Sequence, residues 1–166
     1  MQALTIWVDA DALPGEIKDI ILRAAQRLKI QTVLVANKNL GGRAGLPAAP
    51  GAVALVSFVR VAQGADVADA YIATQCAARD FCITADIPLA AVLVAKGLVV
   101  IDPRGELYSE ANVAERLSVR DFMASLREAG VQTTGPPPFN AKAKQQFAAR
   151  LDSLLSKALR TPRLPS

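Results

Sequence analysis

Two carboxylates follow directly after an apolar run near the N-terminus. The run at 6–8 ends in Asp9 and Asp11, and Pro14 comes three residues later. The apolar, β-branched composition of residues 4–9 predicts a buried strand, and Pro14 suits the first turn of a helix. The sequence has no histidine, which excludes Ser-His-Asp catalysis, Cys-His catalysis and His-ligated metal sites. Chemistry must therefore rest on carboxylates, Lys, Arg, hydroxyl groups or the backbone.

More acids occur where further strands and helices are predicted to meet. Asp66 and Asp69 begin a predicted helix and, at positions i and i+3, share one helix face. Asp86 follows the fourth predicted strand, two residues after Thr84. Because ligand sites in open parallel sheets lie at the carboxyl ends of the strands, these groups should reach one edge of the sheet. The acids expected there are Asp9, Asp11, Asp66, Asp69 and Asp86.

Five acids at one edge repel each other, so some of them would take up protons unless a cation were present. Mg²⁺ or Mn²⁺ suits such a site, because these hard cations favour carboxylate oxygens and water. One or two such ions can activate a water and stabilise the transition state of phosphoryl transfer. The candidates for holding phosphates are Asn37, Lys38 and Arg43, at or on a Gly-rich segment over 38–51.

The same acids also have a structural interpretation. Asp11 can cap the helix that starts at Pro14, and Asp66 and Asp86 can cap the helices that follow them. Helix N-termini cluster at this edge of a parallel sheet, so caps alone would bring some acids together. Both interpretations stay open on the residues themselves.

Strand-like and helix-like segments alternate along the chain. Strands are predicted over 4–9, 31–37, 52–59, 81–84 and 98–101, and helices over 14–28, 66–80, 86–97, 111–129 and 141–159. Ser118 and Asp121 have capping-box spacing, which allows a break in the fourth helix. The strands are continuous apolar runs, so we predict an α/β fold of three layers, with a mostly parallel sheet of about five strands and helices on both faces.

The domain organisation and charge narrow the class of protein further. Residues 1–166 read as one domain, with the Pro-rich stretch 135–138 separating a basic C-terminal helix over 141–159 and a short flexible tail. The net charge is +4, and residues 142–166 carry six basic side chains against one acid, Asp152. Such a tail favours a polyanionic partner such as RNA, although a solvated helix face is the simpler interpretation. A homodimer is left open.

No stretch is long and apolar enough for a membrane span, and the N-terminus lacks the pattern of a signal peptide, so a cytoplasmic protein is expected. The two cysteines, Cys76 and Cys82, match no zinc motif and are expected to be buried and reduced.

Six motifs together resemble the YaiI/YqxD family of uncharacterised bacterial proteins. They are "VDADALP", "VAQGADVADAYI", "ITADIPLAA", "VIDPRGELY", "LSVRDFM" and "GPPPF", and the likeness covers about 4–155 in order. The family is in turn similar to PIN-like and NYN nuclease domains. The resemblance implies a metal-dependent, ribonuclease-like site of Asp9, Asp66, Asp69 and Asp86, with Thr84 as a polar helper.

The sequence departs from the family pattern at two positions. Leu13 stands where many relatives have a cysteine, and Ala70 stands where relatives often have a further acid. The second change leaves the site one carboxylate short. Arg104, Arg120 and Asp121 match family positions, where they either line the site or form an ion pair and a helix cap.

Three functions remain in competition. The first is a Mg²⁺- or Mn²⁺-dependent nuclease acting on RNA, which the acids and the basic tail favour. The second is a phosphatase of the haloacid-dehalogenase type, because Asp9 and Asp11 form a D-x-D after the first strand, but that family's late paired acids and lysine are missing. The third is a non-catalytic RNA- or protein-binding module with a degenerate site, which Ala70 favours.

Overall fold

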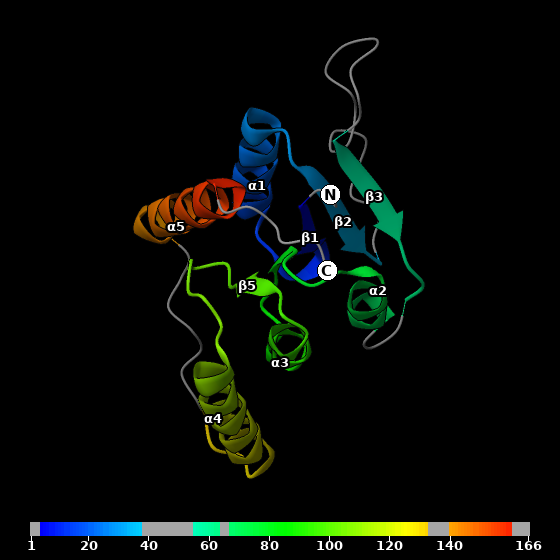
Figure 1. Cartoon of the computed structure of the whole chain (residues 1–166). Helices are drawn as coiled ribbons and strands as arrows, with labels where there is room; N and C mark the ends of the chain where they lie inside the picture. The colour runs from blue at the N-terminus through cyan, green and yellow to red at the C-terminus, as the bar shows by residue number, and fades with distance from the viewer. Residues whose placement is uncertain (1–3, 38–54, 64–66, 133–139, 161–166) are drawn as a thin grey trace.

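The computed structural model describes residues 4–37, 55–63, 67–132 and 140–160 of the chain (Figure 1). Its elements are β1 (Thr5–Asp9), a short 3-10 turn (Ala10–Ala12), α1 (Gly15–Leu28), β2 (Gln31–Ala36), β3 (Val56–Arg60), α2 (Val67–Gln75), β4 (Phe81–Ile83), α3 (Ile87–Ala95), β5 (Val99–Ile101), α4 (Glu110–Glu128) and α5 (Ala141–Arg160).

All pairings within the five-stranded sheet are parallel, and the strand order is β3-β2-β1-β4-β5. The central strand β1 is buried at four of its five residues, as the continuous apolar run predicted. In the register of β1 and β4, Val8 lies opposite Ile83, so Asp9 comes level with Thr84 where both strands end. The predicted α/β class with a parallel sheet of about five strands is confirmed.

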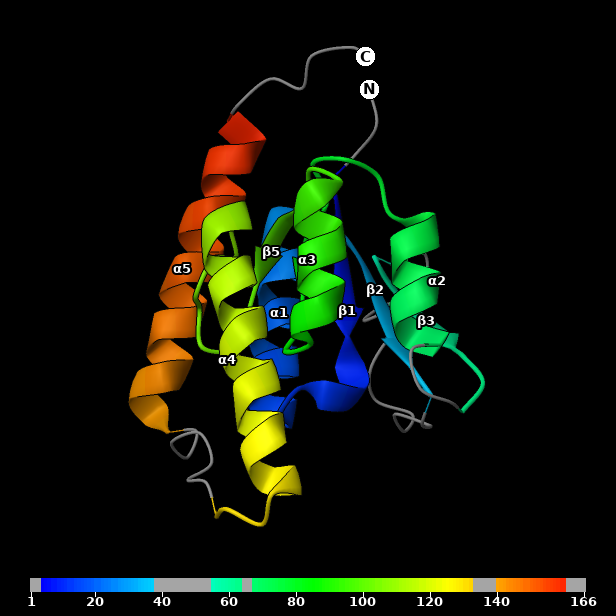
Figure 2. The same ribbon diagram turned by 90° about the horizontal axis from the view of Figure 1, so that it is seen from below.

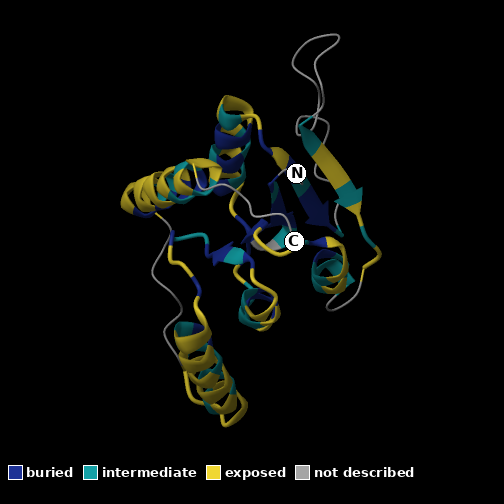
Figure 3. Cartoon of the chain, viewed as in Figure 1, coloured by how far each residue is buried: buried dark blue, intermediate teal, exposed yellow. Residues whose placement is uncertain are grey.

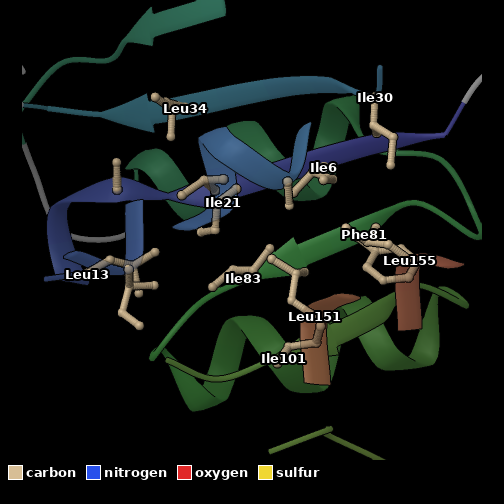
Figure 4. Close-up of a cluster of buried hydrophobic side chains, with 14 of the residues drawn as sticks. Ile6, Leu13, Ile21, Ile30, Leu34, Phe81, Ile83, Ile101, Leu151 and Leu155 are labelled. Atoms are coloured by element: carbon tan, nitrogen blue, oxygen red, sulfur yellow. The ribbon is translucent and has the colours of Figure 1, made fainter. Parts of the chain in front are cut away.

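Helices cover both faces of the sheet, and each face has its own apolar cluster. On one face, α1 and α5 pack side by side over a cluster that includes Ile21, Phe81 and Leu155 (Figure 4). On the other face, Leu93 of α3 and Val113 of α4 belong to a second cluster. Figure 2 shows α2, α3 and α4 in front of the sheet, with α4 outermost and packed against α3. The predicted three-layer arrangement is therefore present.

Helix α4 runs without interruption, so the break allowed at Ser118 is wrong. The Ser118 hydroxyl donates a 3.2 Å hydrogen bond to the Ala114 carbonyl and so does not cap a new helix. The capping box lies nine residues earlier, where the Ser109 side chain accepts from the Asn112 backbone N–H and the Asn112 side chain accepts from the Ser109 N–H. One continuous helix thus spans 110–128.

Several elements differ in length from the sequence prediction, and α3 spans 87–95 rather than 86–97. Helix α2 ends at Gln75 rather than at 80, and Arg79 within the predicted helix has a left-handed φ of 75° that a continuing helix excludes. The Lys96 ammonium donates to the Ala73 and Cys76 carbonyls, at 2.7 and 3.0 Å, and so stabilises the free end of the helix. Strand β3 begins at Val56 and ends one residue later than predicted. The predicted start of that strand, 52–54, lies outside the described residues.

The basic terminal helix packs against α1 by its apolar face. Phe147 and Leu151 are buried, and the outer face is exposed (Figure 3). Two of its charged residues form ion pairs with α1: Asp152 with Arg27, and Lys144 with Glu16 at 3.7 Å. Among the described residues, no helix combines the length and the apolar character that crossing a membrane requires.

A glycine in the turn after β5 lies tightly against the backbone of α5. Gly105 has φ +89°, and an added Cβ would lie 3.0 Å from the Gln146 carbonyl oxygen and 3.1 Å from the Phe147 Cα. Both contacts are with backbone, which cannot move aside without shifting α5. Only a residue without a Cβ fits this position.

We expect Gly105→Ala to lower the free energy of unfolding by roughly 2–4 kcal/mol, because left-handed strain and backbone overlap add together. Gly130→Ala is the matched control, since Gly130 has φ +84° but no atom of the described residues within 4 Å of an added Cβ. It should cost only the strain, roughly 1–2 kcal/mol. Urea denaturation of both variants measures the difference, and equal losses would show that the contact with α5 is unimportant.

Candidate functional site

Asp9 and Asp86 are joined through Thr84 at the carboxyl ends of β1 and β4. The Thr84 hydroxyl donates a 2.9 Å hydrogen bond to Oδ2 of Asp9 and accepts a 3.0 Å hydrogen bond from the Asp86 backbone N–H. Thr84 is fully buried and Asp9 is 6% exposed. The Asp86 side chain caps α3 by accepting from the Leu89 N–H at 2.9 Å. The predicted cap at Asp86 is confirmed. The cap bond uses only Oδ1 of the Asp86 carboxylate, so Oδ2 takes no part in capping.

Asp11 lies beside Asp9 but does not cap α1. Its Oδ2 accepts a 2.7 Å hydrogen bond from the Asn37 backbone N–H, at the end of β2, while Pro14 occupies the N-cap position of the helix. The cap interpretation of Asp11 is therefore wrong, because the carboxylate turns toward the neighbouring strand. Its other oxygen, Oδ1, is buried and has no hydrogen-bond partner among the described residues. A buried carboxylate oxygen without a donor is costly, unless a ligand supplies the missing interaction.

The electrostatics at this edge oppose the charge on Asp9. Burial raises the pKa of Asp9 above its ordinary value of 3.8, and the hydrogen bond from Thr84 lowers this pKa only in part. The negative charges of Asp86 and Asp11 raise the pKa further. Asp9, Asp11 and Asp86 thus lie within electrostatic reach of one another. A cation would relieve the same repulsion.

A cleft of 320 Å³ opens at this point of the sheet edge. The described residues that line the cleft are Asp9, Ala85, Asp86, Ile87, Pro88 and Arg120. Arg120 comes from α4, more than thirty residues after Asp86 and over a hundred after Asp9. The cleft therefore joins acids from the ends of two central strands, an apolar shelf from the first turn of α3, and a cation from the outermost helix.

Asp69 lies on α2 within electrostatic reach of the same strands. Burial raises the pKa of the Cys82 thiol well above its ordinary value, and the charges of Asp9, Cys76 and Asp69 raise it further. Within the described parts of the chain, however, no three acidic or cysteine side chains gather closely enough to hold a metal ion by themselves. Asp66 lies outside these parts, so the grouping of five acids around one ion stays a prediction.

The predicted phosphate-binding residues are placed only in part. Lys38 and Arg43 lie outside the described residues. The backbone N–H of Asn37 donates a hydrogen bond to the Asp11 carboxylate, beside the site. Arg104 lies in the turn after β5, where its backbone N–H donates to Asp102 at 2.8 Å, and it is not among the described residues that line the cleft. Arg120 does line the cleft, and its ion pair with Asp121, at 3.5 Å, is also present.

The two cysteines agree with the sequence prediction. Cys76 and Cys82 are both buried and free. Burial raises the pKa of both thiols, although the nearby Lys96 ammonium lowers the pKa of Cys76 in part. Raised pKa values keep these thiols protonated and unreactive at neutral pH.

Two buried acids that were not predicted as site residues have structural roles. Asp80 lies just before β4, at the opposite edge of the sheet, and accepts hydrogen bonds from the Thr5 N–H, the Trp7 indole and the Ala77 N–H. Asp102 follows β5 and accepts from two backbone N–H groups and from Arg116. A sequence signal existed for Asp80, because it precedes a strand and so lies away from the ligand edge.

These features define a class: an α/β protein with a parallel sheet whose acidic cleft lies at the carboxyl ends of the central strand β1 and its neighbour β4. The family is shown by comparison with known proteins. The family model described as "Uncharacterized BCR, YaiI/YqxD family" matches residues 7–157. The chain belongs to this family, which confirms the resemblance of its motifs.

Several relatives match over almost their whole length. A UPF0178 protein of Myxococcus xanthus is 55% identical over 158 residues, which are 95% of this chain and 98% of the relative. A UPF0178 protein of Trichlorobacter lovleyi is 53% identical over 95% of this chain and 97% of the relative. One of Klebsiella pneumoniae is 51% identical over 92% and 95%. No solved structure matches the chain.

Proposed function

We propose that this protein is a divalent-metal-dependent nuclease that acts on RNA through the cleft at Asp9 and Asp86. One observation carries the proposal: acids from two strand ends and an arginine from α4 line the same small cleft. Hydrolysis of a phosphodiester needs negative groups that hold a cation and a positive group for the phosphate. The likeness of the family motifs to PIN-like nucleases agrees with this assignment.

The residues present suit Mg²⁺ or Mn²⁺. Asp9 uses only one carboxylate oxygen for Thr84, and Oδ1 of Asp11 is buried without a donor among the described residues. Asp9 and Asp86, which both line the cleft, would hold the ion, with the buried Asp11 carboxylate beside them. Mg²⁺ is commonly bound through one or two carboxylates and completed by water and substrate phosphate, so three protein carboxylates around one ion are not required. When bound, such an ion stabilises developing negative charge and helps to generate hydroxide at neutral pH.

Each protein group has a distinct task in this proposal. Thr84 fixes the orientation of the Asp9 carboxylate, because one hydroxyl bridges Asp9 and the Asp86 backbone. Burial of Asp9 keeps bulk water away from that carboxylate and strengthens its interaction with a cation. The cap bond from Leu89 holds Asp86 at the rim of the cleft. The acids are thus held in place before a substrate arrives.

The test is cleavage of end-labelled single-stranded and structured RNA in Mn²⁺. We expect Asp9→Asn and Asp86→Asn each to lower the cleavage rate by roughly 100-fold or more, because each removes a charge that the cation needs. Both substitutions spare the fold, since asparagine can accept the Thr84 hydrogen bond at position 9 and can cap α3 at position 86. EDTA should abolish cleavage by the unmodified protein.

Asp19→Asn is the matched control, because Asp19 is an exposed acid on α1, across the sheet from α3. Its rate should equal that of the unmodified protein. Cleavage that survives unchanged in both site variants would trace the activity to a contaminant. RNA binding without Mn²⁺ or Mg²⁺ binding, measured by calorimetry, would instead establish the non-catalytic binding module.

A further inference from the structure

Arg120 faces the acidic cleft without pairing with the acids in it. Its only ion pair in the described part of the chain is with the adjacent Asp121, at 3.5 Å, and both side chains are more than half exposed. No ion pair with Asp9 or Asp86 forms within 4.0 Å between these described side chains, although all three line the same cleft. An exposed pair between chain neighbours at that distance contributes little to stability. Arg120 therefore has free capacity toward the cleft.

A guanidinium that lines a cleft with carboxylates but does not pair with them is suited to binding an anion there. We propose that Arg120 binds the phosphate of the bound RNA strand, opposite the acids that hold the cation. This inference rests on the proposed function and names the residue that recognises the phosphate. A guanidinium offers two parallel N–H groups to two phosphate oxygens, which places the group as well as attracting it.

The neighbouring arginine on α4 shows what a structural role looks like. Arg116, one turn earlier, donates to the buried Asp102 at 3.1 Å and lies 3.6 Å from Glu106. Its guanidinium also stacks over the Tyr108 ring, 4.5 Å from the ring centroid. Arg116 is thus committed to holding α4 against the turn after β5. That anchor fixes the helix from which Arg120 reaches the cleft.

The volume and lining of the cleft suit a hydrated ion and a phosphate group. Since a water occupies about 30 Å³ in the liquid, a volume of 320 Å³ holds roughly ten waters, which is enough for a hydrated ion and a phosphate group. Ile87 and Pro88 add an apolar shelf to the lining of the same cleft. A sugar ring can lie on such a shelf while its phosphate meets the guanidinium.

The experiment measures binding of a labelled single-stranded RNA oligonucleotide in EDTA, over a series of salt concentrations. Arg120→Gln should weaken binding about tenfold, because a charged hydrogen-bonding group is lost. It should also reduce the slope of log K against log salt by about 0.7, the value for one phosphate contact on a single strand. Arg120→Lys should keep the slope but lose several-fold in affinity, since the bidentate geometry is lost.

Arg23→Gln is the control, because it makes the same charge change at an exposed position of α1, across the sheet from α3 and α4. It should alter affinity less than twofold. Equal losses in Arg120→Gln and Arg23→Gln would overturn the assignment, since only net charge would then matter. Normal RNA binding by Arg120→Gln would overturn it as well.

Failure of this inference and failure of the proposed function give different results. Calorimetry with Mn²⁺ alone tests the acids, and RNA binding in EDTA tests Arg120. If Mn²⁺ binds and RNA is cleaved while Arg120→Gln binds RNA normally, the nuclease stands and the phosphate contact is wrong. If no Mn²⁺ binds while Arg120→Gln loses RNA affinity, the contact stands and the nuclease is wrong.

Discussion

Asp9→Asn should make the protein more stable in the absence of metal, although the same change removes the proposed activity. Burial and the charges of Asp86 and Asp11 raise the folded-state pKa of Asp9, so its ionised form opposes folding. Asparagine keeps an acceptor for Thr84 and removes the charge. We expect a gain of roughly 0.5–2 kcal/mol at pH 7.5, which corresponds to a few degrees in Tm.

The predicted stability difference between Asp9→Asn and the unmodified protein should change with pH in one direction. Because the folded pKa lies above the unfolded value of 3.8, the stability that protonated Asp9 contributes is present below pH 3.8 and is lost as the pH rises through the folded pKa. The difference in Tm between Asp9→Asn and the unmodified protein should therefore shrink as the pH falls toward 4. Thermal unfolding followed by circular dichroism measures it.

Added Mn²⁺ should reverse the order of stability. A ligand that binds only the folded state at about 100 times its Kd adds about 2.7 kcal/mol, so Mn²⁺ should raise the Tm of the unmodified protein by several degrees. Asp9→Asn should show little change. A lower Tm for Asp9→Asn at pH 7.5 would show that the ionised carboxylate supports the fold, and equal stabilisation of both proteins would place the ion elsewhere.

Phe147→Ala should cause the largest loss of stability of the changes considered. Phe147 is fully buried, and it belongs to the same apolar cluster as Ile6 and Ile21 beneath α1 and α5. Its truncation removes apolar burial and leaves a cavity between a helix and the sheet, for a loss of about 3–5 kcal/mol. Because domains commonly have only about 5–15 kcal/mol of stability, this is a large share of the total.

Leu159→Ala is the matched control on the same helix, because Leu159 is 50% exposed. It should change the free energy of unfolding by less than about 0.5 kcal/mol, as surface substitutions usually do. Urea denaturation compares the two variants directly. A similar small loss in both would show that α5 is not docked on the sheet in solution.

The sequence was sufficient for the sheet and for the central pair of acids. Continuous apolar runs identified the strands, and parallel pairing brings residues at strand ends level, which placed Asp9, Thr84 and Asp86 at one edge. The cap at Asp86 also followed from local spacing. These features depend on short-range chemistry and on one topological rule, so no knowledge of distant packing was needed.

Other parts of the site depend on contacts that the sequence does not display. Arg120 reaches the cleft only because α4 continues through Ser118 and packs against α3. The local signal at Ser118 favoured a cap, but its hydroxyl bonds back to the preceding turn. Asp11 likewise had a good local alternative as a cap, whereas its actual partner is the backbone of Asn37 at the end of another strand.

The late position of α5 in the chain affects how the protein emerges during synthesis. The last strand ends at Ile101, yet Leu151 and Leu155, which complete the apolar cluster on one face, come roughly 50 residues later. At translation rates of about 5–20 residues per second, only α1 covers that face for roughly 3–10 seconds, until α5 follows. A nascent chain held on the ribosome would thus present a complete sheet with exposed apolar residues where α5 will pack. Exposed apolar surface of this kind is what chaperones bind.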